Sequence, residues 1–232
     1  MKNKSTVIAT LALLTGSAIA GGASVSNEDS FLSFGAEMPY GDGNMNTNWN
    51  IARNTDNHGD IEIGLKAKER FIGDLMTDGA GRYFANAGSP DNDGLASWNI
   101  DYAFALPADA LPSNYSLVLS VDFDPGFGTQ SFVTLDITNA LAASFIATPA
   151  GGDSQNLGFG FWGASIPFII DASGHIAFDA DAPGEYDVKL SLHAATGAPL
   201  AESAIVVEVL PAPGSVALFG LGGLVATRRR RA

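Results

Sequence analysis

The stretch GEYDVKLSLHAATGAPLAESAIVVEVL, residues 184–210, indicates the fold class most directly, because it holds two strand-like runs joined by a turn. Four apolar residues alternate with polar ones in its first half: Tyr186, Val188, Leu190 and Leu192. A period of two places such residues on one face of a strand. The second half ends in the β-branched run IVVEV, and the letters ATG between the halves are a turn signal. We therefore predict a terminal β-hairpin with one buried face.

Comparable runs occur throughout the chain before this hairpin. Five of them alternate or are rich in β-branched and aromatic residues: IEIGLK (61–66), WNIDYAFAL (98–106), SLVLSVDF (116–123), SFVTLDIT (131–138) and HIAFDA (175–180). The Asn- and Gly-rich stretch upstream predicts loops with one short edge strand at residues 49–52. Gly and Pro separate the runs, and no long helical period is present. The pattern predicts an all-β domain over residues 21–210, an antiparallel β-sandwich or jelly roll.

The composition excludes several classes of protein. The chain has 232 residues and no cysteine, which excludes a disulfide scaffold, a thiolate metal site and thiol catalysis. Six of its twelve Lys and Arg lie at the extreme ends, so the rest carries 25 acidic and 6 basic residues, a net charge of −19. Such a surface repels a phosphate backbone, and we therefore expect no nucleic-acid partner.

The N-terminus has the three parts of a secretory signal peptide. The positive start MKNK precedes an apolar run at residues 7–14, and Ala18 and Ala20 then form a small-x-small cleavage pattern. Cleavage after Ala20 makes Gly21 the first residue of the mature protein. We therefore expect residues 1–20 to direct export and then to be removed.

The C-terminus combines three features in 22 residues. It opens with the turn-forming residues Pro211, Ala212, Pro213 and Gly214. A mostly apolar run of 14 residues, 214–227, follows, and as a helix it rises about 21 Å, short of the ~30 Å hydrocarbon core. It closes with four arginines, Arg228, Arg229, Arg230 and Arg231. These arginines favour a cytoplasmic end, so residues 211–232 are predicted to insert transiently as a short transmembrane helix. The alternative is a terminal core helix followed by a solvated charge run.

This order of Pro-x-Pro, short Gly- and Leu-rich span and arginine cluster resembles the PEP-CTERM sorting signal of Gram-negative bacteria, also catalogued as an ice-binding-protein C-terminal domain. The family's usual tripeptide is Pro-Glu-Pro, whereas this chain has Pro211-Ala212-Pro213 followed by Gly214. The resemblance covers about 23 residues. It implies that an exosortase, a membrane transpeptidase-like enzyme, recognises the tail and cleaves the chain near these residues. It implies nothing about the activity of the domain before it.

Two Asp- and Asn-rich segments are candidates for calcium binding. The candidate oxygen ligands are Asp42, Asn44, Asp91 and Asp93. Closely spaced carboxylate and amide oxygens are the ligands that Ca²⁺ prefers, but neither segment has the Glu that completes an EF-hand loop. The simpler interpretation is that these side chains cap turns. We therefore predict no resident cofactor, with calcium as the alternative.

Three tryptophans are candidates for stacking against sugar rings: Trp49, Trp98 and Trp162. The alternative is that they pack in the core, in which case Phe161 and Trp162, as neighbours on a strand, point to opposite sides of the sheet. No nucleophile elbow, phosphate-binding loop or dinucleotide fingerprint occurs in the sequence.

The sequence as a whole therefore predicts an exported, non-enzymatic protein of the cell surface or extracellular matrix. We expect a structural or interaction role in an exopolysaccharide layer, with an exosortase-type enzyme as processing partner. Two alternatives stay open: a carbohydrate-binding module, and a glycan-active enzyme with a pair of carboxylates facing one another across a cleft.

Overall fold

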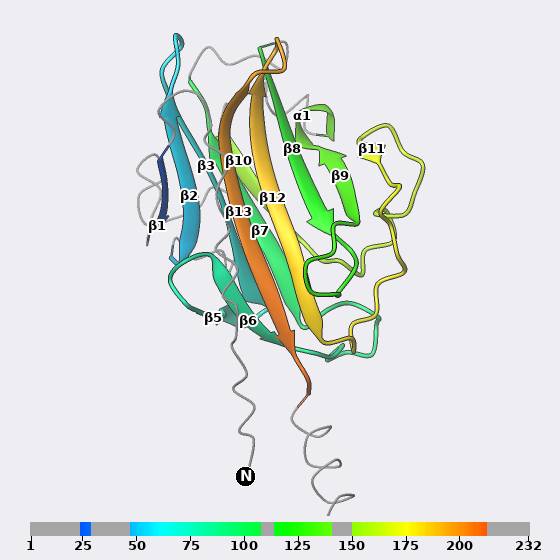
Figure 1. Cartoon of the computed structure of the whole chain (residues 1–232). Helices are drawn as coiled ribbons and strands as arrows, with labels where there is room; N and C mark the ends of the chain where they lie inside the picture. The colour runs from blue at the N-terminus through cyan, green and yellow to red at the C-terminus, as the bar shows by residue number, and fades with distance from the viewer. Residues whose placement is uncertain (1–23, 29–46, 108–113, 141–149, 213–232) are drawn as a thin grey trace, which may run out of the picture.

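The computed structural model describes residues 24–28, 47–107, 114–140 and 150–212, and these form two β-sheets with almost no helix (Figure 1). The one described helix is α1 (Ile137–Ala140), a single turn after a strand. The two sheets pack face to face, so the described chain is an all-β, sandwich-like domain, as the sequence predicts.

The first sheet is antiparallel throughout. Its strand order is β1 (Ser24–Glu28), β2 (Trp49–Thr55), β3 (Asp60–Glu69), β7 (Trp98–Ala105) and β10 (Ala150–Gln155), with β4 (Gly73–Asp74) paired to the end of β3. Strand β2 pairs with β1 on one side and β3 on the other. The prediction of a short edge strand at residues 49–52 is therefore wrong, because β2 is seven residues long and internal.

The second sheet is built around the predicted terminal hairpin. Its order is β11 (Ile169–Asp171), β9 (Phe132–Asp136), β8 (Tyr115–Asp122), β12 (Gly184–Ala194), β13 (Pro199–Leu210), β6 (Arg82–Asn86) and β5 (Met76–Thr77). Strands β12 and β13 pair antiparallel along almost their whole length. Strand β6 pairs with β13 in parallel, which is the exception to the predicted antiparallel arrangement.

The core lies between the two sheets and follows the period-two pattern of the sequence. Tyr186, Val188, Leu190 and Leu192 are buried against the first sheet's Ile61, Ile63, Leu65, Ile100 and Phe104. The polar residues that alternate with the β12 core residues face the other side and are less buried. Burying these side chains supplies the main driving force for folding.

Residues 175–180, predicted as a strand, form none. The amide of His175 donates to the carbonyl of Ala172 in a turn, and the His175 ring packs on Phe123 with centroids 5.3 Å apart. Phe178 packs on Tyr186 instead of alternating with its neighbours. Phe178 therefore packs against the core from a loop, whereas Ile176 is exposed, and a period-two pattern does not distinguish such a loop from a strand.

Buried tyrosines give the domain a predicted weakness at alkaline pH. Burial, reinforced by Asp179 and Asp124, raises the pKa of Tyr186 to about 12, and burial also raises the pKa of Tyr83 and Tyr102. Above pH 10 an unfolded tyrosine loses its proton while Tyr186 keeps it, so the folded state binds more protons and its stability falls as pH rises. We expect the free energy of unfolding to fall steeply between about pH 10 and pH 12 in urea titrations. Tyr186→Phe should lessen this fall by about 1–3 kcal/mol, and an identical pH dependence in the variant would contradict the assignment.

Candidate functional site

The end of β13 is where the folded domain meets the sorting-like tail. The carbonyl of Leu210, the last residue of the strand, accepts a hydrogen bond from the amide of Ala87 at 2.8 Å. Pro211 follows immediately and is exposed. Because proline has no N–H to give to a β-ladder, pairing with a neighbouring strand stops at this residue. The first residue of the tail is therefore accessible directly after the last strand.

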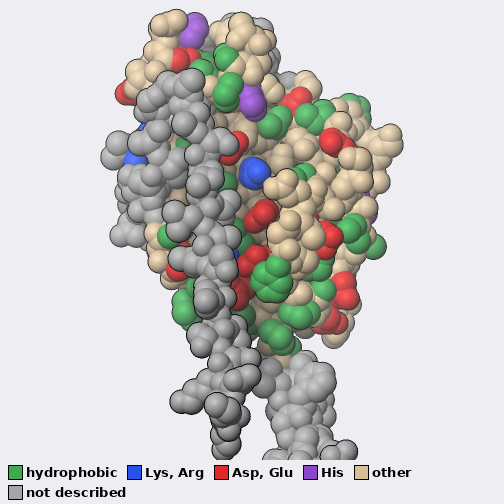
Figure 2. Space-filling view, viewed as in Figure 1, with side chains coloured by type: hydrophobic (Ala, Val, Ile, Leu, Met, Phe, Trp, Pro, Cys, Tyr) green, Lys and Arg blue, Asp and Glu red, His purple; other side chains and the backbone are tan. Residues whose placement is uncertain are grey.

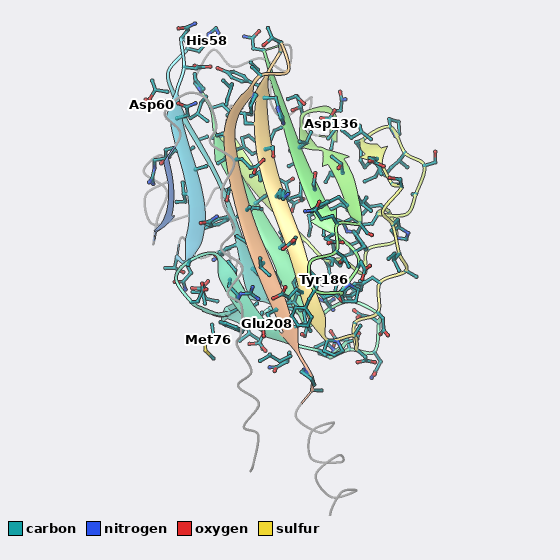
Figure 3. The ribbon with its side chains drawn as sticks, viewed as in Figure 1. His58, Asp60, Met76, Asp136, Tyr186 and Glu208 are labelled. Carbon is teal, nitrogen blue, oxygen red and sulfur yellow. The ribbon has the colours of Figure 1, made fainter. Side chains whose placement is uncertain are left out.

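An ion cluster joins the last residues of β13 to both neighbouring strands. Arg82 on β6 bonds through its guanidinium to Glu185 on β12 and to Glu208 on β13, the latter at 2.9 Å. Burial alone lowers the pKa of a guanidinium, but the hydrogen bonds and charges of the two carboxylates outweigh it and raise the pKa of Arg82. The cluster thus joins three strands just before the tail begins. Glu208 lies near the lower end of the sheet in Figure 3.

Of the predicted sorting residues, the structure describes Pro211 and Ala212. The others lie outside the described residues: Pro213, Gly214, Arg228, Arg229, Arg230 and Arg231. The predicted signal-cleavage residues Ala18, Ala20 and Gly21 lie outside them as well. Within the ranges that are described, no helix is long and apolar enough to span a membrane.

The three tryptophans are buried and do not form a common surface. Trp49 and Trp162 are 0% exposed and Trp98 is 1% exposed. Trp98 packs on Tyr186, whereas Trp49 belongs to a small separate cluster with Ile51 and Ala103 on the far face of the first sheet. The structure therefore places them as core residues, and the stacking platform considered for them is not formed.

The segment around Trp162 also differs from the prediction. Residues 157–163 form turns and not a strand, so neighbouring side chains do not alternate. The Phe161 and Trp162 rings stack on one another with centroids 4.9 Å apart, and the Trp162 indole N–H donates to the carbonyl of Asn156 at 2.9 Å. The expectation that these two rings point to opposite sides of a sheet is therefore wrong.

The calcium candidates Asp91 and Asp93 lie near the guanidinium group of Arg70. Asp93 lies 2.9 Å from the Arg70 guanidinium, and Asp91 lies 3.8 Å from it. Asp93 also accepts hydrogen bonds from the amide of Leu95 and the hydroxyl of Ser89, and these bonds lower its pKa. Asp93 therefore caps a turn, as in the simpler interpretation of this segment. Asp42 and Asn44 lie outside the described residues, and in the part of the chain described here no three His, Asp or Glu side chains are placed to hold a metal ion.

Two carboxylates stand side by side on the outward face of the second sheet. Asp122 on β8 and Asp187 on β12 occupy opposing positions, one residue beyond the pair Val121 and Val188. Burial, and then the charge of Asp122, raises the pKa of Asp187. Asp122 Oδ1 accepts from two backbone amides in the β8–β9 connection and so holds that loop. The pair therefore lies on adjacent strands, unlike the arrangement across a cleft expected of a glycan-active enzyme.

Sequence reasoning missed a buried cluster of charges on the outward face of the first sheet. Lys66 and Lys68 alternate with core residues of β3, yet they are 0% and 8% exposed. Lys66 Nζ lies 2.9 Å from Asp74 Oδ1, and Lys68 Nζ lies 3.2 Å from Asp101 Oδ2. Burial raises the pKa of Asp101, and the charge of Lys68 opposes this shift. Alternation correctly predicts that these residues point away from the core, but it does not predict that they are buried.

The face of the second sheet shown in Figure 2 carries scattered acidic side chains and few basic ones, in keeping with the composition.

Comparison with known proteins found no relative of this chain: no protein-family model and no curated protein matches the sequence, and no solved structure matches the fold.

Proposed function

We propose that the chain is the precursor of an exported surface or matrix protein, targeted by residues 1–20 and processed through residues 211–232. The mature β-sandwich domain serves a structural or interaction role in an exopolysaccharide layer, and an exosortase-type enzyme is its processing partner. The precursor inserts transiently into the membrane by its tail, and the domain itself is not an enzyme.

The observation that carries this proposal is the junction between the last strand and the tail. Backbone pairing ends at Leu210, and the exposed Pro211 begins the segment whose order of motifs resembles a sorting signal. A processing enzyme needs a peptide that is free of the sheet, and a proline at this point cannot donate a further hydrogen bond to the β-ladder. The Arg82 cluster supports the same proposal, because it keeps the domain folded up to the residue where cleavage is expected.

The other functions considered receive less support. A carbohydrate-binding module of the expected kind needs exposed tryptophan rings, and the three tryptophans are buried. A glycosidase needs two carboxylates placed on either side of a bound sugar, and Asp122 and Asp187 lie on neighbouring strands of one sheet. A structural or interaction role requires neither arrangement.

Replacing the four arginines 228–231 by glutamine tests the tail. The change removes the positive charge that fixes the cytoplasmic end, so we expect the precursor to lose delivery to the cell surface in fractionation experiments. The matched control replaces the same residues by lysine, which keeps the charge and should preserve delivery. Substitution of residues 211–214 should also block delivery. Unchanged fractionation of the glutamine variant would overturn the sorting proposal.

A further inference from the structure

Four large apolar side chains are exposed where the tail leaves the domain. Phe71 is 85% exposed, Ile72 76%, Met76 75% and Leu210 40%. Phe71 and Ile72 form the turn between β3 and β4, Met76 lies on β5, and Leu210 is the end of β13. We call these four residues the tail-end patch. Clustered apolar side chains of this size on a protein surface indicate an interaction site.

Backbone hydrogen bonds link the members of this patch at one end of the molecule. Arg70, next to Phe71, donates its amide to the carbonyl of Ser97, and Ser97 donates to Gly88. Ala87, beside Gly88, donates to the carbonyl of Leu210. Met76 belongs to the same sheet as Leu210, two strands away, and Figure 3 shows it at the end of the domain near Glu208.

The tip of the patch is held in an unfavourable backbone conformation. Phe71 has φ of 63°, in the left-handed region that a bulky residue adopts at a cost of about 1–2 kcal/mol. Arg70 lies over its ring, 4.7 Å from the centroid, and also pairs with Asp93. A strained residue that presents an apolar ring to solvent calls for a functional explanation.

We infer that the tail-end patch rests on the lipid surface while the tail is inserted in the membrane. The inference rests on the proposed membrane insertion of the tail. If residues 214–227 lie in the bilayer, only the peptide from Leu210 to Gly214 separates the sheet from it, and four residues span at most about 14 Å. The apolar run is also short for a bilayer. A short span and a short spacer both bring this end of the domain onto the membrane.

The charges around the patch indicate which lipid surface it fits. Asp74, Asp78 and Asp91 lie in the segments next to its members. Of these, Asp74 pairs with Lys66 and Asp91 lies near Arg70, so the patch has no excess of positive charge, and the domain as a whole is strongly acidic. The contact therefore depends on apolar insertion and not on attraction to anionic headgroups. Because the tail tethers the domain, a weak intrinsic affinity is sufficient. Contact should be stronger on zwitterionic phosphatidylcholine than on membranes rich in phosphatidylglycerol.

A tryptophan placed in the patch reports this contact in the full chain. The native tryptophans are buried, so in liposomes of phosphatidylcholine containing a brominated analogue they should be little quenched. Phe71→Trp adds an indole at the tip of the turn, and its emission should be quenched on insertion. The matched control is Ile170→Trp on β11, where the native side chain is 56% exposed and the strand lies beside β9 at the end of the second sheet's strand order.

We expect the added tryptophan of Phe71→Trp to be quenched at least about twofold more than that of Ile170→Trp, with less quenching when phosphatidylglycerol is added. If the chain floats with the vesicles but the two tryptophans are quenched equally, the membrane contact is overturned and a protein partner is the remaining occupant of the patch. If the chain does not float, membrane insertion of the tail fails, and the contact fails with it.

Discussion

Asp101→Ala should lower the free energy of unfolding by about 3–5 kcal/mol, because it removes one member of a buried ion pair. Asp101 is 0% exposed, and Lys68 Nζ lies 3.2 Å from its carboxylate. Lys66 stands directly across from Asp101 in the β3–β7 register, so the variant also removes a negative charge beside this second buried lysine, whose ion pair with Asp74 remains. Chemical denaturation followed by fluorescence of the buried tryptophans measures the change.

The control for this variant replaces both members of the ion pair by apolar residues. Asp101→Leu combined with Lys68→Met removes both charges, and such replacements of buried pairs are commonly neutral or stabilising. We expect the double variant to recover most of the stability lost in Asp101→Ala. A loss of less than about 1 kcal/mol in Asp101→Ala, the range of an exposed pair, would contradict the burial of this cluster.

Trp162→Ala should cost about 3–5 kcal/mol, the usual effect of removing a fully buried indole. The residue lies in a turn-rich connection and not in a strand, yet it is 0% exposed and packs on Phe123 with ring centroids 5.6 Å apart. Its N–H bond to the carbonyl of Asn156 is lost as well, which leaves a buried acceptor with one partner fewer.

Phe161→Ala is the matched control for the loss of Trp162. Phe161 stacks on the same indole but is only partly buried, so its removal should destabilise the domain clearly less. The pair of denaturation measurements tests whether the connection between β10 and β11 is part of the core. Equal and small effects of the two substitutions would show that it is not.

The sequence predicts the strands of this domain best where one face is buried and the other is solvated. Strand β12 is the clear case, because its apolar residues all face the core and its polar residues alternate with them. The same rule fails at residues 175–180, where Phe178 packs against the core from a loop. A short alternating run carries no information about whether a neighbouring strand is available to pair with it.

The features that involve distant parts of the chain were the least predictable. The parallel pairing of β6 with β13 joins residues 82–86 to residues 206–210, and no local pattern encodes it. The burial of Lys66 and Asp101 likewise depends on what covers the outward face of a sheet, whereas composition predicts charged residues at the surface. The tail motif, in contrast, is contiguous in sequence, so its position directly after the last strand could be predicted from the sequence alone.

We expect residues 1–20 and the C-terminal tail to be removed on the way to the cell surface. Intact-mass and terminal-peptide analysis of the protein recovered from the surface of the cells that make it measures this removal. The recovered chain should begin at Gly21 and end between residues 211 and 214, without Arg228 to Arg231. Recovery of a chain that still begins at Met1, or that retains the four arginines at the surface, would contradict it.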